Sequence, residues 1–477
     1  MPLAFAPFEY WILSIISVAG LILLWQQQQS SKYLFTTGFF FGLGYFGVGI
    51  SWVYFSLHDF GNAHPIVAAG ITVLLILWQS LYIALLGLAY AKLLTKFSKS
   101  SALLILPVLW FSMEWLKGIV MTGFPWLSLG YSHVSSPLSP WGSWIGAYAI
   151  SSLSVLYSAA VAVLLTRQLK QNKWLLVLAS VLVVLTAVIT NIEQTSAQEK
   201  SLKITQIQGN IAQEIKWQRN KRQHILDVYW DKTNQHWDSD LIVWPETAIP
   251  GRSELIEESV LLPMSMLATE KQTNILFGVL VSDLAKSQYY NSMLMVGENQ
   301  GMYHKRHLVP FGEYMPFRNI LDFLNQYISI PMSDMQSGEN QQPLMSVANV
   351  KLGVSICYED VFSRDINQDL PEANILINTS NDAWFGDSLA PHQHLQIAQM
   401  RAIETGRPMV RSTNTGISAF INHKGAILKQ TQQFQVETLT ANVTGRTGQT
   451  AFVLIEPYQW LFVVLTSLVF LRRRQNI

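Results

Sequence analysis

Charged side chains are almost missing from the first 192 residues of this 477-residue chain. Eleven occur there, namely Glu9, Lys32, Asp59, Lys92, Lys96, Lys99, Glu114, Lys117, Arg167, Lys170 and Lys173. Composition is then that of a globular domain up to about residue 446, and residues 451–471 are apolar again. A helix needs roughly 20 apolar residues to cross a bilayer. We therefore predict a transmembrane helical domain at 1–192 with about six spans, a globular domain at 193–450, and at 451–477 a transmembrane helix with a basic cytoplasmic tail.

Seven apolar stretches are candidate spans. They lie at residues 11–25, 34–55, 66–90, 102–119, 144–166, 174–192 and 452–471. Lysines and arginines fall in alternate loops, whereas the loops at 58–64 and 122–143 contain none. Cytoplasmic loops carry the excess of lysine and arginine. The pattern predicts a multi-pass protein of a bacterial inner membrane, with the globular domain and the N-terminus on the periplasmic side.

The globular domain combines short strand patterns with helical ones. Strands are expected at 202–208, 241–244, 274–281, 292–296, 351–357, 374–379, 409–412, 417–422 and 439–443, and helices at 213–236, 253–270 and 392–405. Many strands with helices between them indicate a layered α/β domain. The formal net charge of +1 argues against a nucleic-acid partner.

The chain has a single cysteine, Cys357, and therefore no internal disulfide framework. The β-branched, alternating run before it predicts a strand that delivers the thiol at its C-terminal end. An exposed nucleophile is common at such a position in an α/β domain. The alternative is a buried structural thiol, because free cysteine is among the most buried residue types.

Two other polar residues also follow strand signals. Glu246 comes after an apolar strand and a proline, where a poorly solvated carboxylate suits a general base; its alternative is a helix cap or a surface glutamate. Lys305 lies among aromatic residues and prolines, where its ammonium suits a developing oxyanion; its alternative is a solvated basic loop. Base, ammonium and thiol together are the set that thiol acyl transfer requires.

The order of these motifs resembles the nitrilase, or carbon–nitrogen hydrolase, superfamily. The matching runs are Ile242 to Glu246, Lys305 to Glu313, Ile356 to Glu359, Ser380 to Gly386, Met400 to Glu404, Arg411 to Asn414 and, in the apolar block, Thr122 to Trp126. With several spans before the globular domain and one after it, nearly the whole chain resembles the apolipoprotein N-acyltransferase family. That family is expected to have eight spans, so either a first helix is absent here or the start is set too late.

The resemblance implies a fold and a reaction. The fold is a polytopic helical membrane domain plus a nitrilase-like αββα sandwich. Glu246 takes the thiol proton, Cys357 attacks a phospholipid ester, and Lys305 with a backbone N–H beside Cys357 holds the oxyanion. The resulting thioester passes its acyl chain to the N-terminal amine of an S-diacylglyceryl cysteine in apolipoproteins, the last step of bacterial lipoprotein maturation.

The resemblance also implies residues around this triad. Glu313, Tyr358 and Glu359 match family positions that support the active site, although loop or cap carboxylates are an equal alternative for the two glutamates. Tentative residues of the acyl or headgroup path are Trp217, Asn291, Trp384, Phe124 and Trp126, for which ordinary packing is the alternative. His392 and His394 are two apart, which does not suit chelation from one helix face, so we expect no metal and no cofactor.

Two other functions compete with acyl transfer. A membrane-tethered amidase would use the same triad with water as its second substrate, but a small amide would not require six spans. A transporter would carry charges within its spans, and only Glu114 and Lys117 qualify, three residues apart and able to pair along one helix face. Nothing in the sequence demands more than a monomer.

Overall fold

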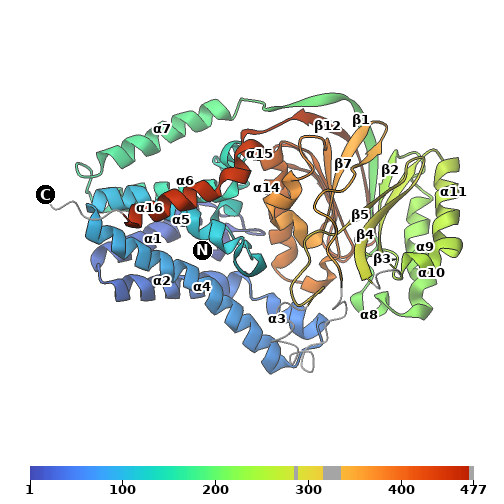
Figure 1. Ribbon diagram of the computed structural model, residues 1–477, viewed down its shortest axis with the longest axis horizontal. Coiled ribbons are helices and arrows are strands. Elements are labelled where there is room, and N and C mark those ends of the chain that lie inside the picture. The colour runs from blue at the N-terminus through green and yellow to red at the C-terminus, as the bar shows by residue number, and fades with distance from the viewer. Residues whose placement is uncertain (284–287, 315–334, 472–477) are drawn as a thin grey trace. The chain divides into compact units, whose positions relative to one another are not determined.

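The computed structural model describes residues 1–283, 288–314 and 335–471 (Figure 1). The predicted basic tail lies outside these residues. The chain divides into two compact units. The helical unit contains residues 1–54, 68–193 and 450–477, and the catalytic unit contains residues 55–67 and 194–449. Residues 55–67 thus belong to the catalytic unit, although in the sequence they lie within the apolar block of residues 1–192.

The helical unit consists mainly of apolar helices. These are α1 (Ile12–Gln27), α2 (Ser31–Gly49), α3 (Val53–Phe55), α4 (Pro65–Lys96), α5 (Lys99–Lys117), α6 (Gly142–Leu165), α7 (Lys173–Ile189), α15 (Ala451–Ile455) and α16 (Trp460–Leu471). Among the described residues, α4 and the segment Ser139–Leu165 are long and apolar enough to cross a membrane. The number rises to four if the bent pairs Ser31–Gly49 with Val53–Phe60 and Ala451–Tyr458 with Trp460–Leu468 are each one span.

Helices occupy all seven ranges that the sequence predicted as spans. α1 and α7 are apolar but contain only 16 and 17 residues. α5 has 19 residues and carries Glu114 and Lys117 in its last turn. Membrane crossing by these three helices therefore remains a prediction.

Glu114 and Lys117 fix the connection between α5 and α6. Glu114 accepts hydrogen bonds from the backbone N–H of Leu129 at 2.8 Å and from Ser151 Oγ on α6 at 2.5 Å. Lys117 Nζ donates to the carbonyl oxygen of Trp126 at 3.2 Å. The two side chains thus bind the loop that follows α5, and their polar groups have a structural role that needs no transported solute.

The catalytic unit contains two six-stranded sheets. In the first sheet the order is β12-β1-β2-β3-β4-β5, and in the second it is β11-β10-β9-β8-β7-β6. The first sheet contains β1 (Thr195–Gln208), β2 (Leu241–Val243), β3 (Asn274–Asp283), β4 (Gln288–Gly297), β5 (Gly301–His304) and β12 (Glu437–Gly448). The second contains β6 (Met345–Val347), β7 (Val350–Ile356), β8 (Ile375–Ser380), β9 (Met409–Thr413), β10 (Ala419–Ile421) and β11 (Ile427–Gln430).

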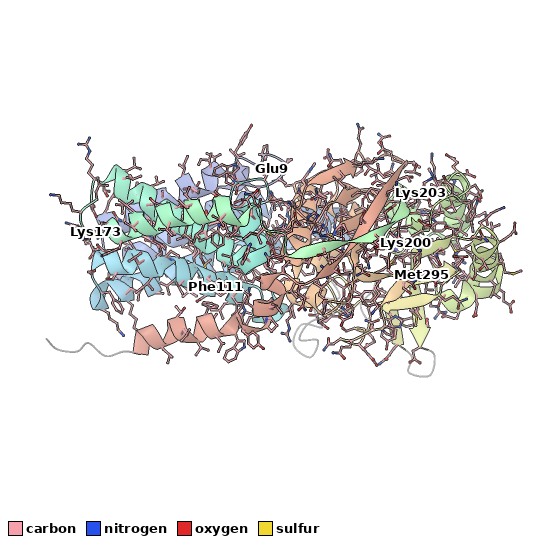
Figure 2. All side chains as sticks on the ribbon, turned by 90° about the horizontal axis from the view of Figure 1, so that it is seen from above. Glu9, Phe111, Lys173, Lys200, Lys203 and Met295 are labelled. Carbon is pink, nitrogen blue, oxygen red and sulfur yellow. The ribbon has the colours of Figure 1, made fainter. Side chains whose placement is uncertain are left out.

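The two sheets pack face to face. Their shared core includes Ile204 and Val243 from the first sheet and Leu352 and Ile375 from the second. Lys203, next to Ile204 on β1 and labelled in Figure 2, instead pairs with Asp238 outside this core. This alternation is expected for a strand with one buried face.

Helices cover the outer faces and complete four layers. Figure 1 shows α9 (Arg222–Thr233), α10 (Ser253–Ile256) and α11 (Leu262–Glu270) on one side of the strands and α14 (Ala390–Thr405) on the other. A second apolar cluster joins α9 and α11 to the first sheet, and a third joins α14 and α13 (Ser363–Asn367) to the second. This arrangement agrees with the predicted αββα sandwich.

One predicted helix is broken and another is irregular. The helix expected at 213–236 stops after the short α8 (Gln213–Lys216) and resumes at α9. The range 253–270 is helical throughout, but a π-helical segment, Glu257–Leu261, joins α10 to α11, which has Pro263 in its first turn, where proline is well tolerated. The sequence also missed β5, β6 and β11, which have only three or four residues each.

Small residues let α2 and α4 approach closely, and this generates a stability prediction. A Cβ atom added to Gly42 would lie 2.7 Å from Ser80 Cα, whereas one added to Gly44 would meet nothing within 4 Å. We expect Gly42→Leu to lower the free energy of unfolding by about 1–3 kcal/mol through overpacking. Thermal unfolding in detergent measures this, with Gly44→Leu on the same helix as the control. Equal melting temperatures for the two variants would contradict the assignment of this helix contact.

Candidate active site

Three polar side chains follow the ends of three strands in the catalytic unit. Glu246 lies three residues after β2, Lys305 directly after β5 and Cys357 directly after β7. β2 and β5 belong to the first sheet and β7 to the second. Because the sheets face each other, the structure brings together residues that are 52 to 111 positions apart in the sequence.

Cys357 sits at a strained turn. Its φ angle is 53°, in the left-handed region that a residue with a Cβ adopts at a cost of about 1–3 kcal/mol. The pairing of β7 with β8 ends at Ile356, and the short helix η9 (Cys357–Val361) begins at the cysteine itself. Its carbonyl oxygen lies 3.2 Å from Asn378 Nδ2 and 3.3 Å from a ring nitrogen of His394. The thiol is partly exposed, so this turn presents it at the end of the strand.

Glu246 is buried and held on both carboxylate oxygens. Asn291 Nδ2 donates to Oε1 at 2.7 Å, and the backbone N–H of Asn381 donates to Oε2 at 2.8 Å. Lys305 Nζ lies 3.7 Å from Oε1. A second lysine, Lys216, donates to the backbone carbonyl of Glu246 at 3.2 Å and is also buried. The carboxylate therefore has a fixed orientation.

Lys305 is a buried cation, with 1% of its surface exposed. Its Nζ donates to Glu313 Oε1 at 2.8 Å and lies near Glu246. Burial opposes the charge, but the carboxylates of Glu313 and Glu246 more than compensate and raise the pKa of Lys305 above its ordinary value. The ammonium is therefore present throughout the neutral pH range.

The thiol of Cys357, in contrast, favours its uncharged form. Burial and the nearby Glu246 carboxylate raise its pKa above the ordinary value, and the Lys305 ammonium offsets only part of this. The resting site therefore contains a thiol, a carboxylate and an ammonium. A proton must leave the sulfur before it can act as a nucleophile, and the carboxylate with the largest effect on the pKa of the thiol is that of Glu246.

The two supporting glutamates have distinct positions. Glu313 binds Lys305 and Asn291 through Oε1 and accepts the backbone N–H of Val309 through Oε2 at 2.8 Å. Glu359 is buried behind the cluster, and burial raises its pKa to about 7. Its carboxylate accepts hydrogen bonds from three backbone N–H groups and one hydroxyl, those of Arg306, His307, Ile356 and Tyr303. It thereby joins the segment after β5 to the end of β7.

Asn291 and Tyr358 are brought to the cluster, but as parts of its frame. Asn291 bridges Glu246 and Glu313 through its Nδ2, and its predicted contact with substrate remains a prediction. Tyr358 is buried and packs edge-on against Phe362.

The predicted aromatic residues of the substrate path are more scattered. Trp217 is 38% exposed and follows Lys216. Trp384 packs against Phe60, from the segment 55–67 of the same unit. Phe124 and Trp126 belong to the helical unit, where they stack on each other. A contact of any of these side chains with substrate remains a prediction.

Sequence reasoning missed Lys216 and Asn378, and it assigned no role to Ser380, within a matching run, or to His394 beyond metal binding. Lys216 precedes the tryptophan that was singled out, and Ser380 and Asn378 lie on the strand β8 beside the cysteine strand. His394 was considered only as a metal ligand, whereas it binds Asp360 and Asp382. Among residues 1–283, 288–314 and 335–471, no three His, Cys, Asp or Glu side chains form a group able to hold a metal ion.

The raised pKa of the thiol predicts slow alkylation at neutral pH. Because Cys357 is the only cysteine, iodoacetamide reports on it alone. We expect the alkylation rate to rise by about tenfold per pH unit between pH 7 and 9, since only the thiolate reacts. Mass spectrometry of samples quenched over time measures the rate, with detergent-unfolded protein as the reference thiol. A plateau below pH 8 would show that the pKa is not raised.

Comparison with known proteins agrees with this architecture. Residues 203–452 match the family described as carbon-nitrogen hydrolase, and residues 1–161 match the one described as apolipoprotein N-acyltransferase N-terminal domain. A protein from Methylococcus capsulatus is 36% identical, with 100% of this chain and 95% of the relative covered. Proteins from Coxiella burnetii and Vibrio parahaemolyticus are 36% and 37% identical, each over 98% of this chain and over 97% and 94% of their own lengths. All three are named apolipoprotein N-acyltransferase, and the identity over nearly complete chains shows that this protein belongs to the apolipoprotein N-acyltransferase family.

Proposed function

We propose that this protein N-acylates apolipoproteins in a bacterial membrane. The acyl chain comes from a phospholipid and passes through a thioester on Cys357 to the N-terminal amine of an S-diacylglyceryl cysteine. One observation carries the catalytic part of the proposal: within the catalytic unit, the buried pair of Glu246 and Lys305 lies close enough to the Cys357 thiol for both charges to shift the pKa of that thiol. Full-length similarity to proteins of that name supports the substrates.

The first half-reaction forms the thioester. Glu246 accepts the proton of the Cys357 thiol as the sulfur attacks the ester carbonyl carbon of the phospholipid. The negative charge moves to the carbonyl oxygen, where the Lys305 ammonium and a backbone N–H beside Cys357 stabilise it. The C–O bond then breaks, and Glu246 returns the proton to the departing oxygen. The products are a lysophospholipid and an acyl-enzyme.

The second half-reaction uses the same groups. The uncharged amine of the diacylglyceryl cysteine attacks the thioester carbonyl carbon. Negative charge then develops on the carbonyl oxygen, again beside Lys305. Glu246 takes one amine proton and returns it to the sulfur when the C–S bond breaks. An amide and the original thiol result. Asn291 contributes by holding Glu246 and Glu313 at fixed positions on either side of Lys305.

The helical unit gives this reaction its location. Both substrates carry acyl chains, and exposing these to water costs about 0.8 kcal/mol per CH₂. A catalyst integrated in the membrane receives them by lateral diffusion. From the loop charges we infer that the catalytic unit lies on the periplasmic side of the inner membrane. One chain contains all three proposed catalytic residues, so a monomer suffices for the reaction.

The amidase alternative is not favoured. It would use the same cluster, but relatives that cover nearly the whole chain, including its apolar block, are named N-acyltransferases. The transporter alternative loses its main support because Glu114 and Lys117 bind the loop after α5.

The test is intact-protein mass spectrometry of the purified enzyme incubated with phosphatidylethanolamine. We expect an added mass of one fatty acyl group on the wild-type protein and none on Cys357→Ala. A diacylglyceryl-cysteine peptide should discharge the acyl group and gain its mass. Hydrolysis of the phospholipid without any acyl-enzyme would contradict the transferase function and favour a tethered hydrolase.

The role of Glu246 is tested in the same assay. Glu246→Gln keeps the shape of the side chain but cannot accept the thiol proton, so we expect acyl-enzyme formation to fall by about 10²- to 10⁴-fold. Glu257→Gln, which changes an exposed carboxylate of the same unit, is the control and should react like the wild type. Comparable rates for the two variants would exclude Glu246 as the base.

A further inference from the structure

Behind the nucleophile lies a cluster of four charged side chains that the proposed chemistry does not use. It consists of Asp360 on η9, Asp382 on η10 (Asp382–Phe385), His394 on α14 and Arg411 on β9, all with at most 1% of their surface exposed. Arg411 bridges the two aspartates, with 3.1 Å to Asp360 Oδ2 and 3.1 Å to Asp382 Oδ2. We call these four residues the rear cluster.

The geometry of His394 requires a protonated ring. One ring nitrogen lies 2.8 Å from Asp360 Oδ1 and the other 3.2 Å from Asp382 Oδ1. A neutral imidazole has a single N–H and would direct a lone pair at one of these carboxylates. With an imidazolium, two anions face two cations and the rear cluster is neutral, as a buried set of charges should be. The same carboxylates raise the pKa of His394 against the effects of burial and of Arg411.

The rear cluster reaches the backbone of Cys357 by two routes. The ring nitrogen of His394 that faces Asp360 is also 3.3 Å from the Cys357 carbonyl oxygen. Asn378 Nδ2 lies 3.2 Å from that oxygen, and Arg411 fixes the amide by donating to Asn378 Oδ1 at 2.6 Å. The left-handed turn at Cys357 takes this carbonyl out of the β7–β8 ladder. Both replacement donors therefore depend on the rear cluster.

A third route leads toward the sulfur. Ser380 Oγ donates to Asp382 Oδ1 at 2.7 Å, and the same hydroxyl interacts with the thiol of Cys357. The cluster thus contacts the nucleophilic residue at its carbonyl and, through Ser380, at its side chain. A strained conformation persists only where surrounding contacts determine it, and here these contacts come from two different elements, α14 and β8.

We propose that His394 is a positioning residue for the nucleophile. Its imidazolium holds Asp360 and Asp382 apart at fixed distances and binds the carbonyl of Cys357, which keeps the residue in its left-handed turn and directs the sulfur toward the substrate. The inference rests on the proposed function in one respect, since the sulfur is taken as the acyl carrier.

The direct experiment compares His394→Gln with Glu404→Gln. Glu404 lies on the same helix, is equally buried and pairs with Arg401 at 2.9 Å, but it belongs to no contact of Cys357 described above. We expect His394→Gln to slow acyl-enzyme formation from phospholipid by at least tenfold, and Glu404→Gln by less than twofold at a similar loss of melting temperature. Equal rates for His394→Gln and wild type, or equal losses in both variants, would overturn the proposal.

A second variant covers the possibility that His394→Gln does not fold. Asp360→Asn keeps the side-chain shape but removes one anion that fixes the ring, and it should slow acylation in the same direction. A wild-type rate in Asp360→Asn would overturn the proposal. If the wild-type protein itself forms no acyl-enzyme, the proposed function has failed. Iodoacetamide alkylation of Cys357 in the wild type, His394→Gln and Asp360→Asn then still reports on the turn. Equal alkylation rates in these three proteins would overturn the positioning role as well.

The charge of His394 gives an independent signature in stability. A histidine with a raised folded-state pKa stabilises the fold fully below its unfolded pKa of about 6.5, and this contribution declines as the pH rises toward the folded value. The groups facing the ring are Asp360, Asp382, Arg411 and the Cys357 carbonyl. We expect the melting temperature of the wild type to exceed that of His394→Gln by more at pH 6 than at pH 8.5. A difference independent of pH would show that the ring is neutral.

Discussion

Burial of the Lys305 ammonium is the constraint on which the active site depends. A cation with 1% exposure is stable only beside anions, and Glu313 at 2.8 Å and Glu246 at 3.7 Å meet that need. The same requirement places a carboxylate beside the thiol, where it raises the pKa of Cys357. Burial and charge pairing together therefore favour the protonated thiol in the resting site. Such an enzyme avoids the side reactions of a permanently exposed thiolate.

The sandwich of two sheets makes this pairing possible. Glu246 and Lys305 come from the first sheet and Cys357 from the second, so the cluster exists only when the sheets are packed together. Glu359 reinforces this arrangement, because its carboxylate receives backbone N–H groups from the segment after β5 and from the end of β7. The apolar core between the sheets and the hydrogen bonds of Glu359 at their ends thus both hold the two sheets together. Loss of either would separate Glu246 from Cys357.

The sequence predicted what depends on local pattern. The seven apolar ranges were correctly predicted as helices because apolar length is a local property. Glu246 and Cys357 were singled out because each follows a predicted strand, and Lys305 because of its aromatic and proline neighbours. The bridge that Asn291 makes between Glu246 and Glu313 was not predicted because it depends on the position of β4 between β3 and β5. His394 was dismissed because its partners, Asp360 and Asp382, are 34 and 12 residues away. The break after Lys216 was missed because the side chain turns inward to a carbonyl that only the folded sheet supplies.

The proposed reaction moves charge without adding any to the buried site. In each half-reaction a proton passes to Glu246 while one negative charge shifts to an oxygen beside Lys305, so the net charge of the cluster is unchanged. Desolvating an additional ion in a medium of low dielectric would cost several kcal/mol, and this sequence of transfers avoids it. Folding has already placed the ammonium and its two carboxylates, so the electrostatic environment of the transition state exists before the lipid arrives. That preorganisation accounts for how a single cluster serves two acyl transfers to chemically different acceptors.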